Sequence, residues 1–180
     1  MELTANSNEI HFVTFTVIDW IDVFTRPIYK DYIIENLEYC RKNKGLEIFS
    51  YVIMPNHLHL ILRSKEKPLS DTIRDFKTYT SKELFKLIKE NPKESRKEWM
   101  ILLMKQAGKY NSSNVNHQFW QRDNQPIKIW DNRQFKIKEN YIHQNPVVTG
   151  FVAHAHAHDF LYSSACKKSP LIVDVCEYKQ

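Results

Sequence analysis

The spacing of apolar positions near the start of the chain predicts a strand followed by a helix. Residues 11–18 (HFVTFTVI) are mostly β-branched or aromatic and partly alternate with polar residues, which is typical of a strand. Pro27 suits the first turn of a helix that we expect to continue to about Asn43. Gly45 then provides the residue type that most readily ends a helix in the left-handed conformation.

Two further apolar runs predict a β-hairpin. Residues 46–54 and 57–62 each have the composition of a strand, and only Pro55-Asn56 separates them. A connection this short allows only a tight turn, so we expect the two strands to pair antiparallel.

Helical spacing dominates the second half of the chain. Apolar residues recur every three or four positions from Leu69 to Leu87, which predicts a long amphipathic helix. Pro146 is expected to stop a later helix, because the residue before a proline avoids the helical conformation. The other elements predicted here are a helix at 94–108, short strands at 117–121 and 127–130, and a last helix from Arg133 to Asn145.

This order of elements predicts an α+β fold of the ferredoxin-like type. A strand, a helix, a hairpin, a second helix and a further strand match the split βαβ arrangement, in which the hairpin strands lie centrally in an antiparallel sheet. Helices would cover one face of the sheet, with extra helices at the C-terminal end. The sequence has no internal repeat or low-complexity stretch that would mark a linker, so residues 1–180 are expected to form one domain.

The distribution of charge indicates a polyanionic partner. The net charge is only +5, but residues 60–140 contain 18 Lys and Arg against 10 Asp and Glu. Such a segment can neutralise phosphates and supply nonspecific nucleic-acid affinity, although a solvated lysine-rich helical face has the same composition. Three cysteines without paired spacing argue against a disulfide framework or a zinc ribbon. With no signal-like or membrane-spanning stretch, we expect a cytoplasmic protein.

A pair of histidines in the predicted hairpin is a candidate metal site. Side chains two residues apart on a strand project from the same face, so His57 and His59 lie side by side while Leu58 and Leu60 point to the core. Two imidazoles on a rigid strand can bind one divalent metal ion. Surface histidines on the polar face of an amphipathic strand would give the same pattern, so the pair alone does not establish the site.

A tyrosine and an asparagine share one face of the last predicted helix. Tyr141 and Asn145 are four residues apart, and Asn145 directly precedes Pro146. A tyrosine hydroxyl can act as a covalent nucleophile, but with a pKa near 10 it is mostly protonated at neutral pH. A metal ion bound to a phosphate of the substrate would make its phosphorus easier for the hydroxyl to attack. The structural alternative is a tyrosine packed against the sheet and an asparagine that caps the helix.

Both segments resemble the signature motifs of a transposase family. Residues 51–62, YVIMPNHLHLIL, are similar to the HUH signature of the single-tyrosine insertion-sequence transposases. Residues 141–152, YIHQNPVVTGFV, are similar to the second signature of the REP-associated tyrosine transposases. The resemblance implies a ferredoxin-like fold, a requirement for Mg²⁺ or Mn²⁺, and single-stranded DNA substrates with hairpin ends.

The resemblance also assigns site residues. It implies two metal-binding histidines, a nucleophile and a third metal ligand, which are His57, His59, Tyr141 and Asn145 respectively. Gln144 is an alternative third ligand, whereas His143 lies about 200° around the helix from Tyr141.

Three more histidines depart from the family pattern. His154, His156 and His158 alternate with alanine in a stretch where the family has no histidines. A strand would align them as a second metal site, but we expect a solvated surface segment there.

DNA contacts are expected from the basic central segment and from aromatic rings. Bases of a single strand stack on aromatic side chains, while cations meet the phosphates. The candidates for phosphate contact are Arg74, Lys77 and Arg122, and those for stacking are Trp120, Trp130 and Tyr110. Core packing is an equally good explanation for Trp120.

These expectations combine into a transposase that nicks and rejoins single-stranded DNA through a 5′-phosphotyrosine. One alternative is a protein that binds hairpin DNA or RNA without cutting it. Another is a metal-dependent phosphodiesterase in which water attacks. Neither alternative forms a covalent adduct with DNA, and the sequence leaves open whether a monomer or a homodimer completes the site.

Overall fold

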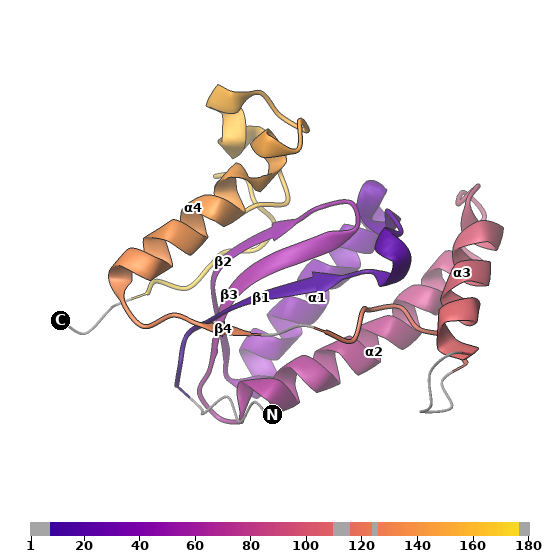
Figure 1. Ribbon diagram of the computed structural model, residues 1–180, viewed down its shortest axis with the longest axis horizontal. Helices are drawn as coiled ribbons and strands as arrows, with labels where there is room; N and C mark the ends of the chain where they lie inside the picture. Colours follow the sequence, from indigo (N-terminus) through magenta and orange to yellow (C-terminus); the bar gives the residue numbers. More distant parts are fainter. Residues whose placement is uncertain (1–7, 110–115, 124–125, 177–180) are drawn as a thin grey trace.

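A four-stranded antiparallel sheet lies at the centre of the molecule. The computed structural model describes residues 8–109, 116–123 and 126–176, and its strands follow the order β2-β3-β1-β4 (Figure 1). The strands are β1 (His11–Thr16), β2 (Leu46–Ile53), β3 (His57–Ser64) and β4 (Ile127–Lys128). This arrangement confirms the predicted ferredoxin-like α+β fold. Only one hairpin strand, β3, is central, because β1 pairs along its other side and leaves β2 as an outer strand.

The hairpin between β2 and β3 has the predicted tight turn. The backbone N–H of Met54 donates to the carbonyl of His57 at 2.8 Å, which closes the turn around Pro55-Asn56. β3 pairs with β1 without interruption, from His57 opposite Thr16 to Leu62 opposite His11. Because β3 also pairs with β2 on its other side, His57 and His59 sit on a central strand of the sheet.

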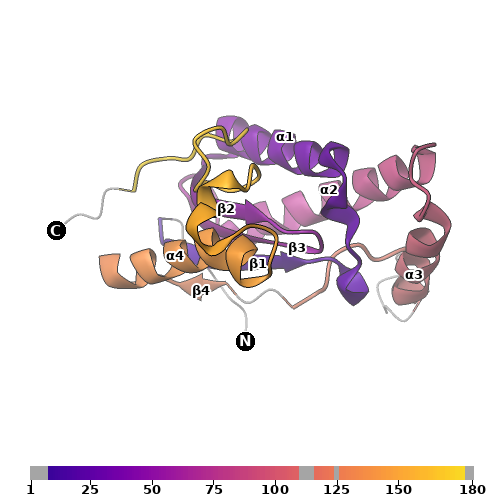
Figure 2. The same cartoon turned by 90° about the horizontal axis from the view of Figure 1, so that it is seen from above.

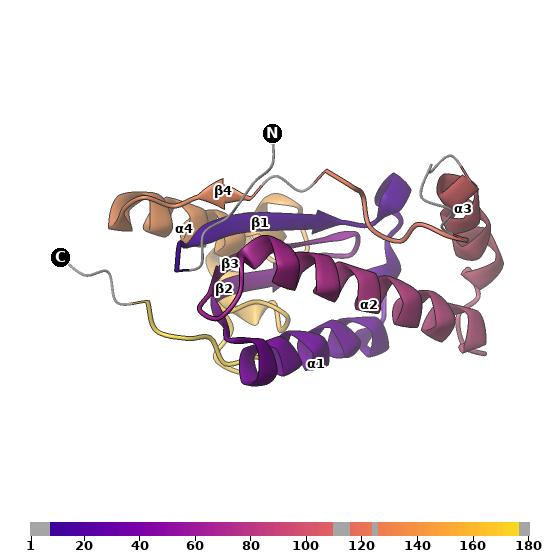
Figure 3. The ribbon, with the colours of Figure 1, turned by 90° about the horizontal axis from the view of Figure 1, so that it is seen from below.

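Two long helices cover one face of the sheet. α1 (Pro27–Lys44) and α2 (Leu69–Glu90) lie side by side beneath the strands, as the view from below shows (Figure 3). α1 ends at Gly45, whose φ of 61° lies in the left-handed region that favours glycine. The main core fills the space between sheet and helices, and α3 (Lys97–Lys109) adds Met100 and Met104 to it.

A further helix packs on the opposite face. α4 (Asn132–Val148) crosses β2 and β3, and the view from above shows it with the segment that follows (Figure 2). A second, smaller cluster joins it to the sheet through apolar residues that include Phe12, Phe49, Ile61, Phe135 and Ile142. The helix predicted from Arg133 to Asn145 is therefore confirmed in position.

Pro146 does not end α4, and that prediction was wrong. The helix continues to Val148, and the N–H of Thr149 still donates to the carbonyl of Asn145 at 3.1 Å. Pro146 is buried; it lacks the N–H that would bond to the carbonyl of Ile142, and its ring crowds that carbonyl. The packing of α4 against the sheet outweighs that loss.

Two other sequence expectations change in detail. Residues 117–121 form no strand and contribute only an isolated bridge between Trp120 and Val17. The strand expected at 127–130 is shortened to β4. The described residues contain no helix long and apolar enough to cross a membrane.

Candidate active site

Two histidines of β3 form the floor of the candidate site on the α4 face of the sheet. The ring centroids of His57 and His59 are 4.7 Å apart, as expected for residues two positions apart on a strand. His59 is buried, with 6% of its surface exposed, and its ring stacks on Phe12 at 5.4 Å. The leucines between and beside the histidines face the opposite core.

Hydrogen bonds orient both imidazoles. The Nδ1 atom of His57 donates to Asn56 Oδ1 at 2.7 Å, and the Nδ1 atom of His59 shares a hydrogen bond with Thr14 Oγ1 at 2.8 Å. When Nδ1 carries the proton, the lone pair of each ring resides on Nε2. Such outer partners fix the tautomer of a metal-binding histidine, and here they would leave both Nε2 atoms available to a metal ion.

Burial keeps these rings neutral. Desolvation lowers the pKa of His59 to about 3, and the positive charges that His57 and Lys138 can carry act in the same direction. Desolvation also lowers the pKa of His57, although the neighbouring Asn145 side chain opposes that shift. A neutral imidazole is the form that binds a metal ion.

Helix α4 places Tyr141 over the same histidines. The centroid of the Tyr141 ring lies 5.1 Å from that of His59 and 5.8 Å from that of Phe12. Tyr141 is 48% exposed, so solvent reaches the side chain even though its ring contacts the site. The two sequence segments that were predicted independently therefore meet within one chain.

Asn145 completes this group with a buried amide. Among the described residues, its buried Oδ1 atom has no hydrogen bond of normal geometry, although the side chain lies close enough to the His57 imidazole to raise the pKa of that ring. A buried oxygen without a partner destabilises a fold by about 1–3 kcal/mol, so an atom of this kind calls for a partner such as a water molecule or an ion. A divalent cation fits this oxygen and the two neutral imidazoles, because Mn²⁺ accepts both nitrogen and oxygen ligands and Mg²⁺ prefers oxygen.

The neighbouring residues on α4 are less suited to the third position. His143 Nε2 lies 2.9 Å from Ser164 Oγ and 3.3 Å from Ser50 Oγ, so its ring is directed to the C-terminal segment. Gln144 is partly buried, and no hydrogen bond of its side chain is described. The unpaired oxygen favours Asn145 over both.

Sequence reasoning missed two side chains beside the site. Lys138 places its Nζ 4.7 Å from the centroid of Phe12 and 5.9 Å from that of Tyr141. Its position three residues before Tyr141, on the same side of α4, is the signal that would have identified it. Trp20 contacts His57 with ring centroids 6.0 Å apart, and no sequence pattern marked it.

The residues predicted to contact DNA are dispersed. Trp120 is 4% exposed, and its Nε1 donates to Thr80 Oγ1 at 3.0 Å, which matches the core-packing alternative. Lys77 turns inward and donates to the carbonyl of Gln121 at 2.7 Å, and desolvation lowers its pKa to about 8. Arg74 is exposed on α2 and pairs with Asp71 at 2.8 Å.

The remaining candidates lie outside α2. Arg122 is exposed, as is Trp130, which has the Nζ of Lys128 3.8 Å from its ring centroid. Tyr110 lies outside the described residues.

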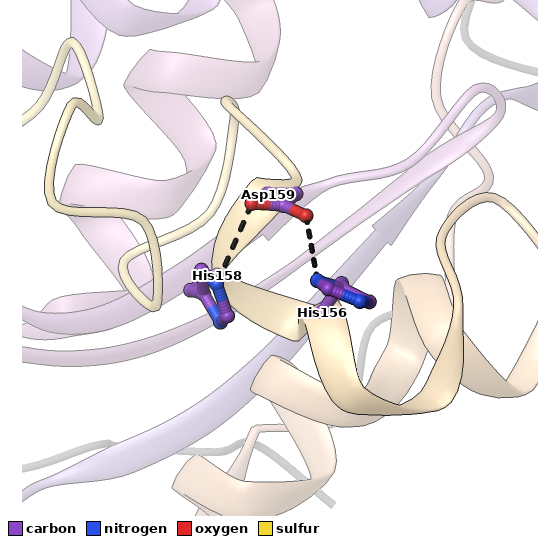
Figure 4. A group of neighbouring side chains, drawn as sticks. All are labelled: His156, His158 and Asp159. Carbon is purple, nitrogen blue, oxygen red and sulfur yellow. Dashed lines mark ion pairs between the residues drawn. The ribbon is translucent and has the colours of Figure 1, made fainter.

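The alternating histidines after α4 form a second polar cluster. In the short 3-10 helix His154–Asp159, the carboxylate of Asp159 lies 3.1 Å from His156 Nδ1 and 3.5 Å from His158 Nε2 (Figure 4). All three side chains are exposed, and their potential ligand atoms lie within 4.8 Å of one another. They lie in a solvated surface segment, as expected, and the side chain of His154 is not described.

Together these groups can perform chemistry on a phosphate. Two neutral imidazoles and one amide oxygen would leave the full positive charge of a metal ion for the substrate, and Tyr141 offers a hydroxyl beside it. Lys138 adds a cation to the same surface.

A family model matches part of the sequence, and a solved structure shares the fold. The model of the IS200-like transposase family matches residues 4–102, more than half of the chain. A solved structure of a REP-associated tyrosine transposase bound to a REP hairpin is similar over 99% of this chain and 93% of its own, with 15% identity and a TM-score of 0.55. A putative transposase from Deinococcus radiodurans covers 80% of this chain and 97% of its own, with 13% identity and a TM-score of 0.47. No curated protein matches the sequence.

The family match carries the assignment. It includes β1, β2, β3 and both histidines, and it ends before Tyr141. The REP-associated structure, at its low identity, shows a likeness of fold that extends over α4 as well. This chain belongs to the IS200-like transposase family and is a DNA transposase.

Proposed function

We propose that this transposase cleaves and rejoins single-stranded DNA through a covalent bond between Tyr141 and a 5′-phosphate. One observation supports this proposal above the others: Tyr141 lies 5.1 Å, between ring centroids, from a histidine of the β3 pair, and Asn145 follows one helical turn later with an unpaired buried oxygen. The proposed nucleophile and the proposed metal ligands thus occupy one surface.

In the proposed reaction the phenolic oxygen of Tyr141 attacks the phosphorus. A P–O bond to tyrosine forms, the bond to the 3′-oxygen of the neighbouring nucleotide breaks, and that oxygen leaves as a 3′-hydroxyl after gaining a proton. A different 3′-hydroxyl then attacks the phosphotyrosine and restores the tyrosine, which completes strand transfer without ATP. The α4 backbone holds the nucleophile in place, which provides the positioning on which phosphoryl transfer depends.

His57, His59 and Asn145 would hold Mg²⁺ or Mn²⁺. When bound, the ion would withdraw charge from a nonbridging oxygen and so lower the barrier to attack. Asn56 and Thr14 orient the imidazoles, and Phe12 excludes water from one side of His59. Lys138 is placed to attract the phosphate backbone as it approaches Tyr141.

The substrate is proposed to be a single strand with a hairpin or repeat element. The similar REP-associated transposase was solved with a REP hairpin, and this chain shares its fold. All four site residues come from one chain, which supports a site that is complete in a monomer, although a homodimer is compatible with it. Action on DNA and three cysteines without a disulfide favour the cytoplasm.

Covalent capture tests this proposal. The protein is incubated with end-labelled single-stranded DNA that carries the hairpin of its own insertion site and with Mn²⁺, and a denaturation-resistant protein–DNA band is expected. Tyr141→Phe should abolish the band, and Tyr39→Phe, an exposed tyrosine on α1, should leave it unchanged. Cleavage that survives Tyr141→Phe would indicate a phosphodiesterase that uses water. Binding without cleavage in the wild type would indicate a hairpin-binding protein.

A further inference from the structure

We infer that the indole of Trp20 binds an unpaired nucleobase of the DNA strand at the edge of the active site. The ligand is a purine or pyrimidine base whose flat face stacks on the indole. This inference rests on the proposed cleavage of a single strand at His57, His59 and Tyr141, and it adds a binding site for the base beside the reacting phosphate.

Trp20 is exposed in a segment that is anchored by buried apolar residues. The indole is 58% exposed, whereas Val17 and Ile21 on either side have at most 2% of their surface exposed. Ile18 packs against the main core. The segment therefore has apolar anchors of its own and presents its largest apolar side chain to solvent, where an aromatic ligand could cover it.

The backbone holds this orientation in an unfavourable conformation. Asp19 and Trp20 have φ angles of 51° and 56°, and neither residue is glycine. Positive φ is uncommon for residues with a side chain and is unfavourable for a bulky one, so it persists where the surrounding structure enforces it. Here the N–H of Trp20 donates to the carbonyl of Val17 and that of Ile21 donates to the carbonyl of Ile18, both at 3.1 Å.

Hydrogen bonds also fix this loop to the turn that precedes His57. The N–H of Val17 donates to the carbonyl of Asn56 at 2.9 Å, and that of Phe24 donates to the carbonyl of Pro55 at 2.7 Å. The guanidinium of Arg96 donates to Asp22 Oδ1 at 2.8 Å and anchors the loop from the other side. The indole is therefore preorganised relative to the site, which reduces the entropic cost of binding a ligand.

The distance to His57 suits a base attached to the reacting phosphate. The centroids of the two rings are 6.0 Å apart with their planes at 75°, so the indole stands at the rim of the site and does not fill it. A phosphate bound at His57 would bring its own base or the next one within reach of Trp20. Stacking of this kind accepts every base, because each base has an aromatic face.

Base binding at Trp20 is tested by measuring DNA affinity in a variant that cannot cleave. Tyr141→Phe serves as the parent protein, and fluorescence anisotropy with Mn²⁺ gives the Kd for a labelled hairpin strand that spans the insertion site. Trp20→Ala should raise the Kd by about 10- to 100-fold, the range expected for loss of one stacked base. Trp20→Phe should retain most of the affinity, and Trp20→Leu, which is apolar but has no aromatic face, should lose most of it. Trp99→Ala, which removes a half-exposed indole of α3, is the matched control.

Abasic substitution identifies the base. Each nucleotide near the cleavage site is replaced in turn by an abasic residue, and one position should weaken binding to the parent as strongly as Trp20→Ala does. With Trp20→Ala that same position should have no further effect, while other positions remain additive. The inference would be overturned if Trp20→Ala left the Kd unchanged. It would also be overturned if the effect of every abasic substitution on binding were simply additive with that of Trp20→Ala.

This outcome is independent of the chemistry. The binding data come from a protein that lacks the Tyr141 hydroxyl, so they are valid even when the wild type forms no covalent adduct. If Trp20→Ala and one abasic position weaken binding non-additively but no covalent adduct forms, base binding at Trp20 stands and the phosphotyrosine mechanism fails. If an adduct forms but the two changes are additive, the mechanism stands and base binding at Trp20 fails.

Discussion

The two faces of the sheet are built from alternate residues of the same strands, yet one is lined by apolar side chains and the other carries the polar groups of the candidate site. On the α1 and α2 face, Leu58, Leu60 and Leu62 of β3 are almost fully buried among apolar neighbours. On the α4 face, His57 and His59 alternate with them and meet a half-exposed tyrosine and an unpaired amide. Adjacent residues of β3 therefore serve different purposes: the leucines stabilise the core, and the histidines face the candidate site.

Helix α4 explains why the second face remains open. It attaches to the sheet through Phe135 and Ile142, which belong to a smaller cluster than the one beneath α1 and α2. This limited attachment leaves Tyr141 and Asn145 at the edge of the contact, where a substrate can approach. The comparison predicts that substitutions on the two faces have different consequences.

Removal of a site histidine should produce the largest effect. His59→Ala is expected to slow single-turnover cleavage in saturating Mn²⁺ by about 10³-fold or more, since a bound metal contributes several kcal/mol to catalysis and 1.4 kcal/mol corresponds to a factor of ten. Rapid-quench measurement of the covalent adduct provides the rate. A rate within tenfold of the wild type would show that the α4 face is not the catalytic one.

The adjacent residue on the other face should affect stability instead. Leu60→Ala is expected to lower the free energy of unfolding by about 2–5 kcal/mol, because it opens a cavity in the main core. Urea unfolding measures this loss, and the cleavage rate of the folded fraction should stay near that of the wild type. Loss of cleavage in a fully folded Leu60→Ala variant would contradict the separation of the two faces.

The faces should also respond to acid in different ranges of pH. In metal-free protein, His59 has a pKa of about 3 in the fold and an ordinary value near 6.5 when unfolded, so the unfolded chain takes up a proton that the folded chain excludes. The free energy of unfolding should therefore fall by about 2 kcal/mol, as an upper bound, between pH 6.5 and 4.5.

Glu94 provides the contrast on the side of α1 and α2. Its side chain is buried and pairs with Arg26 at 2.8 Å and Arg96 at 3.2 Å. Hydrogen bonds from Arg96 and Arg26 outweigh desolvation and lower the pKa of Glu94. This stabilisation is complete above its unfolded pKa near 4.5 and is lost as the pH falls through the lower folded value. Urea titrations at a series of pH values give the free energy of unfolding as a function of pH. His59→Gln should flatten this dependence between pH 6.5 and 4.5, and Glu94→Gln should flatten it below pH 4.5. Identical pH dependences for the two variants would refute this assignment.

Loss of the groups that orient the histidines should have the smallest effect. Asn56→Ala and Thr14→Val remove the hydrogen-bond partners of His57 and His59, and each should weaken Mn²⁺ binding by about tenfold. Isothermal titration calorimetry gives the affinity. Asn36→Ala on α1 is the matched control, because its amide donates to the Tyr32 carbonyl at 2.8 Å and contacts neither histidine. Affinities equal to the wild type would mean that neither partner positions a ligand.

The strand that carries the histidines could be predicted from sequence because its pattern is local. A two-residue turn and alternate leucines determine the faces of β3, so the orientation of His57 and His59 follows from periodicity alone. The four-residue spacing likewise places Tyr141 and Asn145 on one side of α4. Their convergence with β3 is a long-range packing result, and only the resemblance to a family implied it.

The failures arise where long-range packing overrides local preference. Pro146 stays inside α4 because the burial of its ring and the packing of the helix on the sheet outweigh the local cost of a proline. Lys77 was expected to face phosphates, but its amine bonds to a distant carbonyl, which charge counts cannot reveal. Asp19 beside Trp20 is a residue type that tolerates positive φ, but a bulky indole with positive φ follows from no local pattern, so the sequence does not indicate that Trp20 is exposed.

The most direct test of the central claim is anomalous diffraction from crystals of the protein soaked with Mn²⁺. The account predicts one strong peak between β3 and α4, at coordination distance from Nε2 of His57, Nε2 of His59 and Oδ1 of Asn145, with the Tyr141 hydroxyl facing it. A peak bound elsewhere, or ordered His57 and His59 rings with no metal between them and Asn145, would contradict it.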